Sequence, residues 1–225
     1  MSETGRAIQA GLLAPGSTIS LRDAADELGV RRSSLHSQLE QLERYGLLAV
    51  DRSGTATVAP LDPAEVGAIC RLLLAIVPTL NAAASARISP LAARRIHRDA
   101  ALINDLPIEN RYDAMTELFV NLMRPAATEV ELNQLRFLHT GLQRYHHIGI
   151  TDMIRNQDDE FLRYREIREE LNGTFNIGDA DGAYRISQLL IAAYERFGTH
   201  SLTVAASDGA SSRAFAGKAP ILRLV

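Results

Sequence analysis

The sequence predicts a mostly α-helical protein, in which an N-terminal winged helix-turn-helix precedes a C-terminal all-α antiparallel helical bundle. Three observations lead to this prediction. Up to about residue 60 the elements are short and interrupted by glycine and proline, whereas long helical stretches follow as far as residue 199. Between these parts, the Ala-Pro-Leu-Asp-Pro segment at 59–63 interrupts both helix and strand, because proline has no backbone N–H.

The first part contains the helices of a winged helix in their usual order. Two short helices are predicted at residues 3–10 and 23–28, the second with Ser20 as a candidate N-cap. A third helix begins after Ser33 or Ser34, because either hydroxyl can cap it.

One side of the third helix is lined by leucines at the spacing of a buried helix face. The expected core of this part consists of Leu28, Val30, Leu35, Leu39 and Leu42. Gly46 is expected to end the helix. A β-hairpin, the wing, is predicted at 47–50 and 55–58, joined by a turn that ends in Gly54.

The second part consists of apolar and amphipathic helical stretches. Helices are predicted at 63–87, 90–105, 112–123, 128–147, 151–172 and 179–197. We therefore expect a winged-helix domain at 1–61, an all-helical domain at 62–200 and a flexible tail at 201–225.

Composition narrows the class of protein. The net charge of −3 argues against nonspecific attraction to nucleic acid, although a local basic patch remains possible. A single cysteine, Cys70, excludes an intramolecular disulfide. The chain has no unbroken apolar run of about 18 residues and no secretory h-region, so we expect a soluble cytoplasmic protein without a membrane partner.

A helix-turn-helix places its second helix in the major groove of DNA, where each base pair shows a distinct donor and acceptor pattern. The outer face of that helix needs long polar side chains, and Arg32 and His36 share one face because they are four residues apart. The candidate DNA-binding residues are Arg22, Arg31, Arg32, Ser33, Ser34 and His36, with Arg52, Gly54 and Thr55 at the wing tip.

Four segments of this part resemble the GntR family of bacterial regulators, in order and with matching spacing. They are Ile8–Ser17, Leu28–His36, Leu42–Leu48 and Gly54–Leu61. The resemblance covers most of residues 8–61. It implies a transcription factor that binds double-stranded DNA as a homodimer, at a short palindromic operator with one half-site per subunit.

Two features depart from the family pattern. The first helix is short, and His36 stands where the family has a second arginine in the recognition helix. In addition, residues 1–61 contain six arginines and seven acidic residues. Since phosphate neutralisation supplies much of DNA affinity, we expect modest affinity and a marked need for dimerisation. The alternative is a winged helix that contacts protein.

Residues 63–199 resemble the all-helical effector domain, called FCD, of the FadR-like branch of that family. Asp62–Val66 followed by Arg71 is similar to its first helix, with Ala75 where glutamate is usual, and Gly178–Ala183 is similar to the start of its last helix. The resemblance implies six or seven helices around a cavity that binds a small-molecule effector, an organic acid in particular.

Many members of this branch bind a metal through an aspartate and three histidines. The matching positions here are Met115 and Phe119, or Asp113 and Glu117 in a shifted alignment, followed by Arg168 and Leu190. Because none is a histidine, we expect no metal and no other cofactor.

Four residues are candidates for effector binding. Arg71 and Arg168 can meet a carboxylate or phosphate bidentately, although Arg168 can equally form a surface ion pair with nearby acids. His139 and His146 are seven residues apart on one helix face, where they either line the cavity or lie at the edge of the core.

Three functions follow from these patterns. The favoured one is a repressor whose operator affinity changes when an effector binds, each ligand altering the affinity for the other by the same factor. The second is an architectural or protein-interaction module without an effector. The third is a helical enzyme with an incidental winged helix, which the lack of phosphate-loop, dinucleotide-binding, nucleophile-elbow and zinc-protease motifs argues against.

Overall fold

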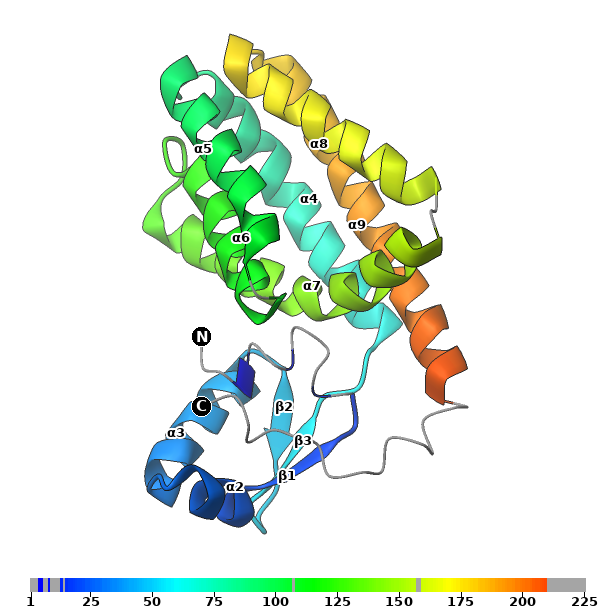
Figure 1. Cartoon of the computed structure of the whole chain (residues 1–225). Helices are drawn as coiled ribbons and strands as arrows, with labels where there is room; N and C mark the ends of the chain where they lie inside the picture. Colours follow the sequence, from blue (N-terminus) through cyan, green and yellow to red (C-terminus); the bar gives the residue numbers. More distant parts are fainter. Residues whose placement is uncertain are drawn as a thin grey trace.

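The computed structural model describes residues 4, 5, 8, 13, 15–106, 108–156 and 159–209 (Figure 1). The fold is mostly helical with one small sheet, as the sequence predicts. Two hydrophobic cores are present, one built from residues between Ile8 and Val58 and the other from residues between Val66 and Phe197.

The N-terminal part is a winged helix. Its elements are β1 (Thr18–Ser20), α2 (Leu21–Leu28), α3 (Arg32–Arg44), β2 (Leu48–Val50) and β3 (Thr55–Val58). The strands form an antiparallel sheet in the order β1-β3-β2, which confirms the predicted hairpin. The predicted cap is also confirmed, because Ser20 Oγ accepts a hydrogen bond from the Asp23 backbone N–H at 3.3 Å.

The start of α3 differs from the prediction. Arg31, with extended backbone, is the N-cap residue and its side chain makes no capping hydrogen bond, so neither predicted serine caps the helix. Val30 is 44% exposed rather than in the core. Gly29, at φ +63°, turns the chain directly before it, so the helical spacing of apolar residues does not continue into the turn.

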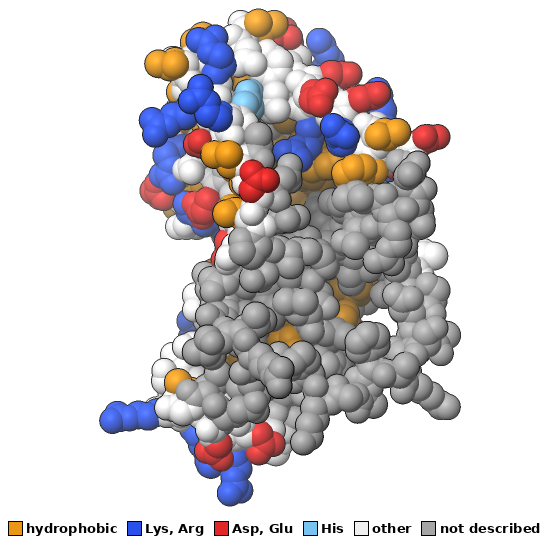
Figure 2. All heavy atoms as spheres, in the orientation of Figure 1, with side chains coloured by type: hydrophobic (Ala, Val, Ile, Leu, Met, Phe, Trp, Pro, Cys, Tyr) orange, Lys and Arg blue, Asp and Glu red, His pale blue; other side chains and the backbone are white. Residues whose placement is uncertain are grey.

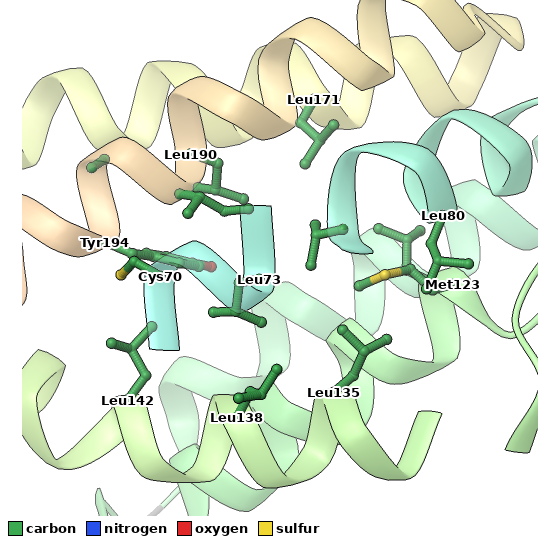
Figure 3. Close-up of a cluster of buried hydrophobic side chains, with 14 of the residues drawn as sticks. Cys70, Leu73, Leu80, Met123, Leu135, Leu138, Leu142, Leu171, Leu190 and Tyr194 are labelled. Carbon is green, nitrogen blue, oxygen red and sulfur yellow. The ribbon is translucent and has the colours of Figure 1, made fainter. Parts of the chain in front are cut away.

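The C-terminal part is a bundle of long helices. Its elements are α4 (Pro63–Ser85), α5 (Pro90–Leu102), the 3-10 turn η1 (Ile103–Asp105), α6 (Ile108–Met123), α7 (Glu129–Asn156), α8 (Asp159–Ile177) and α9 (Ala180–Gly209). Figure 3 shows the core between them, where Leu73 of α4, Leu138 of α7 and Leu190 of α9 converge.

Helices α4 and α9 lie side by side along their length (Figure 1). Gly198 permits this packing, because a Cβ atom at that position would lie 2.5 Å from Val66 Cγ1. Farther along, Asn81 Nδ2 donates a hydrogen bond to Ser187 Oγ at 2.9 Å inside the core. The two helices therefore form the centre of the bundle.

Two helix boundaries in the bundle were predicted wrongly. Helix α7 is continuous through residues 147–151, where the sequence predicts a break, since an isolated helical glycine such as Gly149 costs only about 1 kcal/mol. Helix α9 continues to Gly209, so residues 201–209 are helical where a flexible tail is expected. The rest of the expected tail, 210–225, lies outside the described residues, as does most of the predicted first helix.

Helix α4 is long and apolar enough to cross a membrane, judged by length and composition alone. The core helix of a bundle meets the same criteria, and 44% of the apolar stretch of α4 is buried inside the fold.

The connection between the two parts is anchored to the bundle. The buried Tyr145 hydroxyl of α7 accepts a hydrogen bond from the Asp62 backbone N–H at 3.0 Å and donates one to Glu65 Oε2 at 2.5 Å. Asp62 also caps α4, accepting from the Ala64 N–H at 2.8 Å. The last residue before α4 is thus held by a helix from the middle of the chain.

Gly29 provides a first test of this fold. The Cβ atom of an alanine at this position would lie in open space, so the substitution causes no clash. Its cost comes from the left-handed backbone, which is unfavourable for any residue with a Cβ atom. We therefore expect Gly29→Ala to lower the free energy of unfolding, measured in urea, by about 1–2 kcal/mol. Gly173→Ala on the exposed face of α8 is the matched control. It should stabilise by up to about 1 kcal/mol, and equal effects at the two sites would contradict the capping role of Gly29.

Candidate nucleic-acid interface and ligand pocket

The winged helix contains a hollow of about 360 Å³ bounded by α2, α3 and the wing. Its lining consists of Ser20, Leu21, Arg22, Arg32, Ser33, His36, Ser53 and Gly54. Five predicted DNA-binding residues therefore lie together, although they come from three elements of the chain. Figure 2 shows charged side chains projecting from this end of the molecule.

The other four predicted residues do not line this hollow. Arg31, Ser34 and Arg52 are exposed, and the Thr55 hydroxyl lies 3.0 Å from Ser53 Oγ in the wing. Sequence reasoning missed Ser20, Leu21 and Ser53. The first two lie where β1 meets α2, and a three-residue strand gives no alternation that would reveal it.

The wing tip is held by one carboxylate. Asp51 Oδ1 accepts hydrogen bonds from Ser53 Oγ at 2.6 Å, from the Ser53 N–H at 2.8 Å and from the Thr55 N–H at 2.9 Å. The Ser53 hydroxyl and then the Thr55 N–H lower the pKa of this carboxyl group. The turn that presents Arg52 is therefore ordered before any ligand binds.

Arg32 and His36, the two long polar side chains on the outer face of α3, have weak partners. Arg32 Nη2 lies 4.0 Å from Asp26 Oδ1, and His36 Nε2 lies 3.5 Å from Glu40 Oε1, and all four side chains are about half exposed or more. Exposed pairs of this kind contribute at most about 1 kcal/mol, so a phosphate or a base edge can replace the acid.

The bundle contains a separate small cavity of about 60 Å³. Its wall is largely apolar, with Phe119, Leu171 and Leu190 among its residues. Its polar residues are His97, His139, Arg168, Asn172 and Tyr194. The lining includes no acidic side chain among the residues that the structure describes.

One cation and two histidines define the electrostatics of this cavity. Burial lowers the pKa of His139 to about 4 and also lowers the pKa of His97, so both rings are neutral at pH 7. Tyr164 and Tyr194 raise the pKa of the half-buried Arg168, whose guanidinium carbon lies 5.6 Å from the centre of the Tyr164 ring. The cavity therefore has positive character.

His139 belongs to a buried polar cluster. Its Nδ1 atom lies 2.9 Å from both Thr116 Oγ1 and Gln143 Nε2, and Gln143 Nε2 donates to Thr116 Oγ1 at 2.6 Å. Because an amide nitrogen only donates, Nδ1 is the acceptor and the ring proton lies on Nε2. An aromatic side chain also packs on the face of the His139 ring: the Phe119 ring stacks on it, with 4.9 Å between the two ring centroids.

Two candidate effector-binding residues are not placed in this cavity. Arg71 is exposed on α4 near Glu195, so the expected pairing of Arg71 with Arg168 in one pocket is wrong: position 71 faces away from the α4 residues that enter the core. The side chain of His146 lies outside the described part of the structure. Across the described residues, no group of three or more His, Cys, Asp or Glu side chains could hold a metal ion.

The fold has counterparts among solved structures. E. coli McbR/YncC superposes with a TM-score of 0.63 at 12% identity, over 93% of this chain and 99% of that chain. The Listeria monocytogenes protein Lar, described as controlling expression of the agr system, superposes with a TM-score of 0.56 at 15% identity, over 87% and 93%. These structures are GntR-family transcriptional regulators rather than enzymes.

This chain has the fold of GntR-family regulators. A GntR-family regulator from Pseudomonas syringae is also similar, with a TM-score of 0.44 at 17% identity over 92% of this chain and 84% of that one. No family model matches the sequence, and no curated protein does.

Proposed function

We propose that this protein is a cytoplasmic, homodimeric transcriptional repressor that binds a short palindromic operator and responds to a small organic acid. The observation that carries the proposal is the hollow between α3 and the wing. It brings Arg22, Arg32 and His36 onto one surface with the glycine of the wing tip. Regulators with this fold support the DNA-binding part of the proposal.

In this proposal α3 enters the major groove. Helix α3 has 13 residues, so it is about 20 Å long and can present Arg32, Ser33 and His36 to successive base pairs. Arg52, at the end of the ordered wing, contacts the adjacent backbone or minor groove. A two-fold dimer then places two such helices one or more turns of DNA apart.

The test is selection of DNA from a random duplex library with the purified full-length protein. We expect the recovered sequences to share a two-fold symmetric motif, and the affinity for it to fall as salt concentration rises. Recovery of no enriched sequence at low salt would contradict the proposal and favour the protein-interaction alternative.

The cavity beside Arg168 is the proposed effector site. A guanidinium without an acidic neighbour in the cavity is suited to a carboxylate, and the apolar wall suits a short hydrocarbon body. A cavity of about 60 Å³ has room for only a few ligand atoms, since a single water already needs about 10–15 Å³ of such space. The proposed ligand is therefore a very small acid.

Helices α6 and α7 connect this cavity to the DNA-binding part. Thr116, which contacts His139 of the cavity, also lines a second hollow that includes Gln41 and Tyr45 at the end of α3. The Tyr45 ring stacks on Phe137 of α7 at a centroid distance of 5.8 Å. A ligand that shifts α7 would therefore shift the end of the recognition helix.

Arg168→Met tests the effector site. Loss of a charge-assisted hydrogen bond costs about 1.5–3 kcal/mol, so we expect binding of formate, acetate or propionate, measured by calorimetry, to weaken roughly tenfold to a hundredfold. Operator binding without acid should be unchanged. Arg165→Met, at an exposed position of the same helix, is the control and should retain acid binding.

The small volume of the cavity also favours one alternative, a winged-helix module without an effector. If none of these acids changes operator affinity in the wild-type protein, that alternative replaces the effector part of the proposal.

A further inference from the structure

The outward side of helix α5 carries a row of arginines between two exposed leucines. Leu91 is 73% exposed and Leu102 is 58% exposed, at or near the two ends of the helix. Arg94, Arg95 and Arg98 lie between them along the chain, and all three are exposed. We call these five residues the α5 basic face.

The spacing of these residues places them on one side of the helix. They follow one another at intervals of three, one, three and four residues, so each lies within about 60° of Leu91 around the helix axis. The opposite side packs into the bundle, where Ala93 is fully buried and Ile96 and His97 line the small cavity. The basic face is therefore the side of α5 that remains available to a partner.

The arginines of the basic face line a hollow of about 520 Å³. Leu91 and Asp99 complete the lining. Since Asp99 is the one acidic residue in the sequence of α5, the three arginines leave the lining with a net charge of +2. Figure 2 shows positively charged side chains gathered over the part of the bundle where Figure 1 places α5.

The three arginines lack partners within the part of the chain that the structure describes, where none of them has an ion pair or a hydrogen bond. On α8, by contrast, Arg163 pairs with Glu166 at 2.9 Å. Arg94 and Arg98 are four residues apart, and like charges at this spacing repel each other on a helix. A carboxylate beside them would relieve the repulsion, and a guanidinium can bind it with two hydrogen bonds. The basic face therefore suits an anion.

The two leucines indicate which kind of anion fits. A nucleic-acid backbone presents sugar and phosphate, and has no aliphatic side chain to cover Leu91 and Leu102. Recognition of an anionic lipid surface typically uses clusters of four to eight Lys or Arg residues, more than the three present here. A protein segment with acidic residues between two apolar ones complements both the charges and the leucines, and arginine is enriched at protein interfaces.

We propose that the α5 basic face is a docking site for an acidic helix of a partner protein, with an apolar residue at each end of that helix. Leu91 and Leu102 are eleven residues apart, which is about 17 Å of helix, so the apolar residues of the partner helix need the same separation. Contact along one short helix is small, and we expect a transient complex with a dissociation constant on the order of 100 µM. The inference goes beyond the proposed function, because it needs neither an operator nor an effector.

A labelled model peptide tests the proposal. Fluorescein-LAAEEAAEEAAL-amide repeats the spacing of the basic face in both chain directions, with glutamates opposite the arginines. Its anisotropy is followed as full-length protein is added to roughly 500 µM, several times the expected dissociation constant. We expect binding that weakens as salt concentration rises, and at least roughly fivefold weaker binding when glutamine replaces every glutamate. Equal binding of the two peptides, or binding of neither, would overturn the proposal.

Two variants of equal charge separate the docking site from overall charge. Arg94→Gln, Arg98→Gln should weaken binding of the acidic peptide roughly fivefold to thirtyfold, since two exposed ion pairs are lost. Arg165→Gln, Arg185→Gln is the matched control, because it removes the same charge from exposed positions of α8 and α9. The control should bind the peptide as wild type does. An equal loss in both variants would refute a site on α5.

Leu91→Gln, Leu102→Gln tests the apolar ends, because it leaves the charge unchanged. It should weaken peptide binding about threefold or more, since exposed leucines gain by contact with the leucines of the peptide. An unchanged affinity would contradict the requirement for an apolar residue at each end.

Duplex DNA of random sequence and phosphatidylglycerol vesicles identify the other possible partners of this surface. The Arg94→Gln, Arg98→Gln variant should bind both as the Arg165→Gln, Arg185→Gln control does. A selective loss of DNA or vesicle binding in the first variant would overturn the proposal and assign the basic face to nucleic acid or to a lipid surface.

Discussion

Replacing Arg32 by alanine should weaken operator binding between roughly 30-fold and about 20,000-fold. A bidentate contact to a base edge contributes about 1–3 kcal/mol, and a symmetric dimer makes the contact twice. The side chain is well placed for this role because it lines the hollow between α3 and the wing, and its neighbour Asp26 is 4.0 Å away. Fluorescence anisotropy with the selected operator measures the effect.

Arg98→Ala is the matched control for this variant, since it removes the same charge from an exposed position on α5, a helix of the bundle rather than of the winged helix (Figure 1). It should change operator affinity less than threefold. If both variants lose affinity equally, Arg32 acts only through overall charge. If neither loses affinity, α3 does not read DNA, and the protein-interaction alternative gains support.

The unfolding free energy should fall by about 3 kcal/mol on account of His139 as the pH drops from about 7 to 4. Burial lowers the pKa of this ring from 6.5 in the unfolded chain to about 4 in the fold. Over that range only the unfolded chain binds the proton, so acid favours unfolding, at about 1.4 kcal/mol per pH unit. The stabilisation is complete above about pH 6.5 and is lost as the pH approaches 4.

Urea unfolding at pH 7 and pH 5 measures this dependence in wild type and in His139→Asn, whose amide oxygen can accept in place of Nδ1. Wild type should lose about 2 kcal/mol more than the variant between these two conditions. His97, whose pKa is also lowered by burial, maintains part of the pH dependence in both proteins. His36→Asn, on the exposed surface, should behave as wild type, and an equally steep loss in His139→Asn would refute a neutral buried ring.

Local signals in the sequence predicted much of the winged helix. The Ser20 cap and the buried leucines of α3 depend on neighbours within a few residues, and both are confirmed. Strand β1 was missed because its existence depends on pairing with β3, 37 residues away, as in the partnership of Ile19 with Ala56.

Even less of the ligand cavity could be predicted from the sequence, because its residues come from helices that are far apart in the chain. Arg168 was a candidate because of its alignment with a metal ligand, but His97 and Asn172 could be found only when α5 and α8 were placed beside each other. The predicted pairing of Arg71 with Arg168 in one pocket was wrong, because the side of α4 that faces the core depends on where α9 packs. For the DNA surface, by contrast, one short helix and one hairpin carry most of the side chains, so their positions follow from local geometry.

The anchoring of Asp62 by Tyr145 has a practical consequence for hybrid regulators. Although Asp62 follows the proline-containing connector, its backbone N–H is bonded to α7, and Tyr145 continues to Glu65 on α4. A chimera that joins a foreign DNA-binding part to this bundle should therefore be spliced before Asp62, within 59–61. A junction beyond Glu65 would instead remove the carboxylate that accepts a hydrogen bond from the Tyr145 hydroxyl.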